Sequence, residues 1–210
     1  SKALLVPVNS SNGISKALQS YSGIAGLAGI SLPSNNVQGN TDKAIQKISS
    51  LSFFENSILP NIFLPDLMAV KSWNSETNTL AYDQDIFIEN SNTWANQKIP
   101  RSQESFKVFI SLLTLTQNKG FITLSIKHQS PFVAKQWVEL VINEVNSFYR
   151  QKDKSESERA VSYLNKQISI TSLSEIKQVM ARLLQEETKK LTLIEANQFY
   201  VFDYIDPPAV

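Results

Sequence analysis

The residue types that most often carry out chemistry in proteins are scarce in this sequence. It contains no cysteine and a single histidine, His128, so it offers neither a thiolate metal site nor a histidine with a second imidazole or thiol as partner. The nucleotide-binding loops GxxxxGKS/T and GxGxxG, the nucleophile elbow GxSxG and the zinc-protease motif HExxH do not occur. The carboxylates are scattered, and we interpret single acidic residues such as Asp83, Asp85 and Glu89 as solvated loop residues and not as metal ligands. The sequence therefore predicts no catalytic, metal or cofactor site, and we expect a protein that is not an enzyme.

Tryptophan side chains could still bind a ligand, because an indole face offers a broad apolar surface on which a sugar ring can stack. Trp137 lies at helical spacing among apolar residues and is better explained as core. Trp73 and Trp94 have no such pattern around them. They leave a carbohydrate-binding module open as an alternative function.

The composition allows a folded core and argues against a nucleic-acid partner. Hydrophobic residues make up 42% of the 210 residues, and the formal net charge is only +1. No window approaches the roughly 18 consecutive apolar residues of a membrane span, and no signal peptide is visible. Because the sequence starts at SKALLVPV and stops at IDPPAV, we expect an excised segment whose flanking targeting or membrane elements are missing.

The N-terminal region begins with a predicted strand and a glycine-containing segment. Residues 2–8 are apolar and β-prone, and Pro7 favours an edge strand because it lacks an N–H donor. Gly23, Gly26 and Gly29 follow at a spacing of three residues. This spacing fits either a loop or a helix that packs closely against a neighbour.

The middle of the sequence predicts short helices and a β-hairpin. TDKAIQKISSLSFFENSIL predicts short helices that begin at an N-cap on Thr41 or Asp42, and a further helix begins near Ser102. Residues 111–117 and 121–127 alternate apolar and polar side chains. The tripeptide NKG between them indicates a tight turn that joins two antiparallel strands.

A long helix and a second helix occupy most of the remainder. Ser130 and Pro131 form a strong helix start, and an apolar stripe at helical spacing follows them. The stripe consists of Val133, Trp137, Val141, Val145 and Phe148. Residues 150–159 contain no apolar side chain, and the apolar stripe resumes after them. Because this segment also contains no Gly or Pro, the sequence predicts one continuous helix. The capping-box sequence SLSE at residues 172–175 predicts the start of a second helix that ends near Ala196.

These elements predict an α+β fold in two parts. Residues 1–130 and 199–210 form a small α/β base, which includes a closing strand at residues 199–205. If membrane elements flank the segment, this base is its membrane-proximal part. Residues 131–198 form a long α-helical hairpin that projects from the base. If the first and last strands lie together, both ends of the chain leave the base from one side.

The hairpin carries about half of the charged residues with no net sign. Pairs at i,i+4 are expected between Lys154 and Glu158, Arg182 and Glu186, and Glu186 and Lys190. A solvated face explains these charges, and side-by-side packing against copies of the same chain is the sharper hypothesis. The predicted contact residues between copies are Lys152, Lys154, Glu156, Glu158, Arg159, Arg182 and Glu186.

Two long stretches resemble a known family. ITLSIKHQSPFVAKQWVELVINEVN is similar to the segment that enters the long helix of Wzz-type polysaccharide chain-length determinants, also called polysaccharide co-polymerases. SLSEIKQVMARLLQEETKKLTLIEANQFYVFDYIDPPAV resembles the descending helix and closing strand of that family. SKALLVPV and TDKAIQKISSLSFFENSIL fit its first strand and base helices. SGIAGLAGISLP departs from the best-known O-antigen regulators and is more similar to members associated with exopolysaccharide.

The resemblance implies a bacterial inner-membrane protein whose periplasmic part is this segment, with a transmembrane helix on each side. It implies a homo-oligomeric ring that regulates the length of a surface polysaccharide, either O-antigen or a related lipopolysaccharide or exopolysaccharide. A Wzy-type polymerase makes that polysaccharide, so the polymerase and the nascent chain are the implied partners. No cofactor and no nucleic acid are implied. A periplasmic adaptor whose hairpin docks a channel stands beside the carbohydrate-binding module as an alternative.

Overall fold

The computed structural model describes residues 1–8, 37–197 and 199–210, and it confirms the predicted α+β class. The strands are β1 (Lys2–Pro7), β2 (Val70–Asn74), β3 (Thr79–Tyr82), β4 (Phe87–Ile88), β5 (Thr93–Trp94), β6 (Leu113–Asn118), β7 (Phe121–Ile126) and β8 (Phe202–Asp206). The α-helices are α3 (Val37–Ile48), α4 (Leu51–Phe53), α5 (Leu64–Met68), α6 (Ser102–Leu112), α7 (Pro131–Ile170) and α8 (Ser174–Ala196). A π-helix, η1 (Phe54–Ile58), and the 3-10 helices η2 (Leu59–Asn61), η3 (Glu89–Ser91) and η4 (Ala95–Gln97) complete the elements. The segment around Gly23, Gly26 and Gly29 lies outside the described residues.

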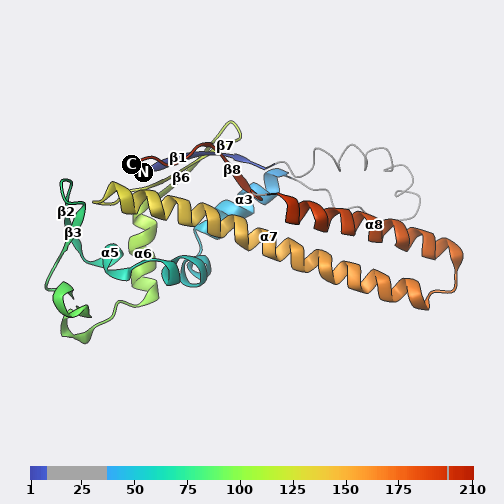
Figure 1. Ribbon diagram of the computed structural model, residues 1–210, viewed down its shortest axis with the longest axis horizontal. Helices are drawn as coiled ribbons and strands as arrows, with labels where there is room; N and C mark the ends of the chain where they lie inside the picture. The colour runs from blue at the N-terminus through green and yellow to red at the C-terminus, as the bar shows by residue number, and fades with distance from the viewer. Residues whose placement is uncertain (9–36, 198) are drawn as a thin grey trace. The chain divides into compact units, whose positions relative to one another are not determined.

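The largest sheet is antiparallel and has the order β6-β7-β1-β8 (Figure 1). The prediction that β1 is an edge strand is wrong, because β1 pairs with β7 on one side and with β8 on the other. Pro7 is tolerated because it is the last residue of the strand, opposite Phe202. The next residue restores the pairing, since the Val8 N–H donates to the carbonyl of Val201 at 2.8 Å.

The predicted β-hairpin at NKG is confirmed. Asn118 pairs with Phe121, so that Lys119 and Gly120 form the two-residue loop between β6 and β7. Both loop residues have positive φ, at 49° and 86°. This is the backbone that a tight hairpin turn requires, and the glycine supplies the larger angle without strain.

The sheet buries one face by strict alternation. Ile122, Leu124 and Ile126 of β7 are buried, and Ala3 and Leu5 of β1 pair with two of them in register. The period of two residues per strand therefore places the apolar side chains of neighbouring strands together. Phe53, Phe54, Ile58 and Phe109 add buried side chains from the helices of the same unit.

The first short helix begins earlier than predicted, whereas α6 begins at Ser102, as predicted. The backbone of α3 is already helical at Val37, so Thr41 lies inside the helix, where it is buried, and is not its N-cap. The next helix, α4, does have a side-chain cap, because the Ser50 Oγ accepts the Phe53 N–H at 3.3 Å. An upstream extension of α3 removes the need for a cap at Thr41.

The first part of α7 buries a continuous face. Its fully or nearly buried residues are Ala134, Trp137, Val138, Val141, Ile142 and Val145. The predicted stripe included Val133 and Phe148, but Val133 is half-buried and Phe148 is 36% exposed. The buried face therefore includes Trp137, Val141 and Val145 of the predicted stripe and three further residues next to them.

The chain divides into two compact units, and α7 contributes to both. One unit comprises residues 1–145 and 201–210, and the other comprises residues 146–200. This division differs from the predicted boundary at residue 131. The difference arises because the first turns of α7 bury their apolar face within the first unit.

The second unit is an antiparallel two-helix hairpin. The continuous helix predicted through residues 150–159 is confirmed, since α7 runs for 40 residues, about 60 Å at 1.5 Å per residue. The two helices run side by side in opposite directions (Figure 1). Lys154 on α7 pairs with Glu195 near the end of α8, and the hydroxyl of Thr171, in the turn, donates to the Met180 sulfur of α8. The predicted capping box is wrong, because the N-cap of α8 is Leu173, which makes no side-chain cap hydrogen bond.

Candidate functional site

The part of α7 that lacks apolar side chains meets the C-terminal end of α8 through polar contacts. Arg150 Nη2 donates to the backbone carbonyl of Asn197 at 2.6 Å. The Tyr200 hydroxyl donates to Asp153 Oδ2 at 2.5 Å. Arg150 and Asp153 are three residues apart on one side of α7, so both can contact the same partner segment. In the segment of α7 without apolar side chains, hydrogen bonds within the chain thus take the place of apolar contacts.

An ion pair lies beside these hydrogen bonds. Lys154 on α7 and Glu195 on α8 are in direct contact. The hydrogen bond and the charge of Lys154 lower the pKa of Glu195, and the same contact raises the pKa of Lys154. Because both side chains are partly exposed, the pair adds little to stability. We name the group of contacting residues the polar clasp; it consists of Arg150, Asp153, Lys154, Glu195, Asn197 and Tyr200.

Asp153 is the central acceptor of the polar clasp. Burial first, and then the hydrogen bond to Asp153, raises the pKa of Tyr200 well above its ordinary value. Burial and the charge of Asp153 also raise the pKa of Tyr149. Tyr200 therefore remains a protonated donor at neutral pH.

Lys152 lies 5.9 Å from the centre of the Tyr149 ring, at the outer range of a cation–π contact.

Ser157 follows the polar clasp along the same helix and is buried, with 1% of its surface exposed. Its hydroxyl oxygen makes no hydrogen bond within the described part of the chain. An unsatisfied buried hydroxyl is unfavourable by about 1–3 kcal/mol relative to a satisfied one. The small side chain, and not its hydroxyl, is therefore what this position uses.

The seven predicted contact residues lie mainly on exposed surface of the hairpin. Lys152 pairs with Glu156 at 3.9 Å, and Arg159 donates to the Ser155 hydroxyl at 3.2 Å. Lys154 is the exception, because it is half-buried in the polar clasp. The exposed members are Lys152, Glu156, Glu158, Arg159, Arg182 and Glu186.

The three predicted i,i+4 pairs are wrong. Among the side chains that the structure describes, the ion pairs within 4.0 Å join Lys135 to Glu139, Lys152 to Glu156 and Lys154 to Glu195. Lys154 turns toward α8 instead of toward Glu158, since the facing helix offers a carboxylate. In the other two predicted pairs, Arg182 and Glu186 are exposed. Ion pairs at exposed positions contribute only tenths of a kcal/mol and do not hold long side chains in place.

Sequence patterns missed the most connected residues of this region. Arg150, Asp153, Asn197 and Tyr200 were not among the predicted contacts. The available signal was the placement of Arg150 and Asp153 three residues apart inside the segment without apolar side chains. Nothing in the sequence indicated that Tyr200, 47 residues away from Asp153, would supply the donor.

His128 connects three elements of the first unit. Its Nδ1 accepts the Ser130 N–H at 3.0 Å, and its Nε2 lies 2.9 Å from the Asp66 carbonyl, to which it donates. Its ring packs edge to face on Trp137 at a centroid distance of 5.0 Å. These contacts fix the tautomer with the proton on Nε2. The geometry gives His128 a structural role at the start of α7.

A shallow groove of about 340 Å³ lies next to His128. Its lining residues are Asp66, Leu67, Val70, Val108, Leu112, Lys127, His128 and Gln129. The carboxylate of Asp66 accepts the Tyr82 hydroxyl at 2.6 Å, which turns one of its oxygens toward a protein partner. The groove therefore combines aliphatic walls with the amide of Gln129 and three ionisable residues, Asp66, Lys127 and His128. Of these, the Asp66 carboxylate and the His128 ring already make hydrogen bonds to protein groups.

The two tryptophans that the sequence left open have partners in the first unit. The Trp73 indole N–H donates to Asn78 Oδ1 at 2.9 Å, and its ring lies 6.3 Å from that of Phe132. Trp94 packs edge to face on Phe87 at 5.4 Å. Both rings are half-buried, so only part of each surface is accessible to a ligand.

In the described ranges 1–8, 37–197 and 199–210, no group of three or more acidic, histidine or cysteine side chains could hold a metal ion. Asp83 and Asp85 instead form a loop turn, in which the Asp83 carboxylate accepts the Asp85 N–H at 3.0 Å. None of the helices described in these ranges is both long and apolar enough to cross a bilayer. A scan against protein-family models and a search of curated proteins found no match for this chain.

Proposed function

We propose that this chain is the periplasmic part of a Wzz-type polysaccharide chain-length determinant. It would regulate the length of a surface polysaccharide, O-antigen or a related polymer, that a Wzy-type polymerase makes. It would do so as a homo-oligomeric scaffold in the bacterial inner membrane and without a catalytic step. The sequence resemblance motivates the proposal, and the geometry of the sheet is the observation that supports it best.

That observation is the pairing of the first and last strands. β1 and β8 are antiparallel neighbours, with Leu4 opposite Asp206. The Ser1 hydroxyl donates to the Ala209 carbonyl at 2.8 Å, so the two ends of the chain lie together (Figure 1). Two transmembrane helices that continue from these ends would enter the membrane side by side. A segment held between two neighbouring membrane spans requires this arrangement.

The hairpin supports the scaffold part of the proposal. The part of α7 in the second unit, residues 146–170, is about 38 Å long at 1.5 Å per residue and offers a surface for lateral contacts. Six of the seven predicted contact residues are exposed on this part of α7 and on α8. Polar contacts between neighbours are individually weak, but a closed ring repeats each of them at every interface. Ring geometry would then set how long a nascent polysaccharide stays with the polymerase.

The decisive experiment is deletion of the full-length gene followed by sizing of the surface polysaccharide on a gel. We expect the modal length distribution to be lost and to return when the gene is restored. An unchanged distribution in the deletion strain contradicts the proposal. The mass of the detergent-solubilised full-length protein provides a second test, because a monomer excludes the ring.

The predicted contact residues can be tested on the same gel. Reversing the charges of Lys152, Glu156, Glu158 and Arg159 together should change the modal length, whereas Lys135→Gln with Glu139→Gln serves as a control pair on the first part of α7. If the charge-reversed protein gives wild-type lengths, these residues are solvated and do not contact a neighbouring copy.

A further inference from the structure

The turn of the α7–α8 hairpin exposes apolar side chains. Ile170 and Leu173, on the two sides of the turn, are 68% and 58% exposed. Tyr163, Ile176 and Val179 are exposed by 63%, 42% and 43%. We name these five residues the tip patch. Isolated exposed apolar residues are ordinary, but five of them within residues 163–179, around the turn of a helical hairpin, indicate a surface that another phase or molecule covers.

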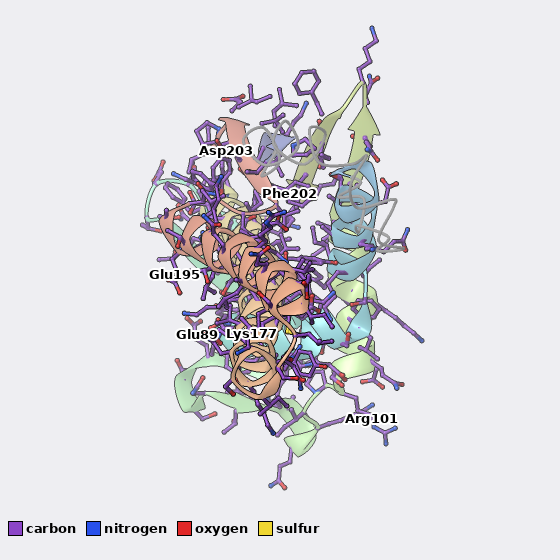
Figure 2. The ribbon with its side chains drawn as sticks, turned by 90° about the vertical axis from the view of Figure 1, so that its right-hand side faces the viewer. Glu89, Arg101, Lys177, Glu195, Phe202 and Asp203 are labelled. Atoms are coloured by element: carbon purple, nitrogen blue, oxygen red, sulfur yellow. The ribbon has the colours of Figure 1, made fainter. Side chains whose placement is uncertain are left out.

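The charges around the tip patch have a predominant sign. Residues 163–182 contain the bases Lys166, Lys177 and Arg182 and a single acid, Glu175, which gives a net charge of +2. All four side chains are exposed. Figure 2 faces this end of the hairpin and labels Lys177 on α8, with Glu195 at the other end of the same helix. The apolar side chains are thus accompanied by a basic rim.

We propose that the tip patch inserts into the surface of a lipid bilayer that contains anionic lipids. Interfacial segments combine apolar side chains that enter the acyl boundary with Lys and Arg side chains that remain at the headgroups. A tyrosine suits the same boundary because its ring is apolar and its hydroxyl is polar. If the tips of two copies met, their positive charges would repel each other. This inference goes beyond the proposed function and does not rest on it.

A labelling experiment tests insertion directly. Because the chain contains no cysteine, Ile170→Cys introduces a unique site for an environment-sensitive fluorophore. Ile99→Cys is the matched control, since Ile99 is 67% exposed and lies far from residue 170 in sequence. With vesicles of equal parts phosphatidylcholine and phosphatidylglycerol, we expect a blue shift and an intensity increase at position 170 and none at position 99. High salt should weaken the effect.

Two variants separate the apolar and the basic contributions in vesicle co-sedimentation. Ile170→Ser with Leu173→Ser should lower the partition coefficient about tenfold or more, because the apolar area that enters the bilayer is removed. Lys166→Gln with Lys177→Gln should lower binding to the anionic vesicles severalfold and leave binding to pure phosphatidylcholine unchanged. Ile99→Ser should bind as the wild type does. All these positions are exposed, so circular dichroism should report an unchanged fold.

Three results would overturn the proposal. The first is no blue shift and no co-sedimentation of the full 210-residue chain with anionic vesicles. The second is an equal shift at positions 170 and 99, which indicates unspecific adsorption. The third is a shift at position 170 that occurs without lipid as the protein concentration rises, together with a doubled mass, because a second copy then covers the tip.

Discussion

The two ends of the α7–α8 hairpin contrast in a way that residue type alone does not predict. At one end, the polar clasp places charged and polar side chains between the helices, with Arg150 bonded to Asn197 and Tyr200 bonded to Asp153. At the turn, apolar side chains such as Ile170 and Leu173 are more than half exposed. Polar side chains are thus partly buried at one end, whereas apolar side chains are exposed at the other.

The contrast shows that burial of a side chain between two helices depends on whether the facing helix offers it a contact, and not only on whether the side chain is polar. A polar side chain lies at little cost between two helices when each of its atoms meets a donor or acceptor. An apolar side chain at a turn lacks a facing helix, because the partner chain reverses there. The polar clasp therefore joins α7 to the end of α8 and the residues after it by hydrogen bonds and an ion pair, whereas the side chains of the tip patch are exposed.

The largest effect should come from comparing a buried and an exposed isoleucine of the hairpin. Ile194 is 3% exposed and Ile170 is 68% exposed. We expect Ile194→Ala to lower the free energy of unfolding by about 2–4 kcal/mol, because it leaves a cavity. Ile170→Ala should change it by less than about 0.5 kcal/mol. Urea unfolding followed by far-ultraviolet circular dichroism measures both, and equal effects would contradict the description of the tip as exposed.

A pair of tyrosines tests the polar clasp. Tyr200→Phe removes the hydroxyl that donates to the Asp153 carboxylate. We expect the free energy of unfolding to fall by about 1–2 kcal/mol. Tyr163→Phe is the matched control on the exposed tip, where the loss should be below about 0.5 kcal/mol. Hydrogen exchange of the α8 amides should accelerate only for the Tyr200 variant. If both variants behave alike, the clasp does not hold the helices together.

Ser157 should respond in the opposite direction. Ser157→Ala removes a buried hydroxyl that has no partner, and we expect a gain of about 1 kcal/mol in unfolding free energy. Ser162→Ala, at an exposed position of the same helix, should gain only the difference in helix propensity, about 0.5 kcal/mol. Thermal unfolding compares the two variants. A loss of stability for Ser157→Ala would indicate that the hydroxyl is in fact bonded.

The smallest effect should be the pH dependence of the Lys154–Glu195 pair. The pKa of Glu195 is lower in the folded chain than its ordinary value, so its contribution to stability is present above that ordinary value. The contribution disappears as the pH falls through the lowered pKa. Titration of the Glu195 carboxyl by NMR should show a higher pKa in the Lys154→Met variant and at high salt. Identical titration curves would show that the pair does not form in solution.

Sequence patterns correctly predicted those elements that are stabilised by interactions between residues close together in the sequence. The NKG turn, the start of α7 near Ser130 and Pro131 and the length of α7 all follow from turn chemistry and helical periodicity. Predictions about edges and caps were less successful. Pro7 indicated an edge strand, yet β8 pairs on that side of β1, and no local signal reports a partner about 200 residues away.

The sequence by itself determined the α+β class, the continuity of α7 through its polar segment and the scarcity of residues suited to catalysis. Only the tertiary structure decided which polar side chains fill the helix interface and which apolar ones remain exposed. The physical reason is the range of the interactions. Turn geometry and helical hydrogen bonds act over a few residues, whereas the pairing of Tyr200 with Asp153 and the exposure of Ile170 depend on where a distant helix begins, ends and turns back.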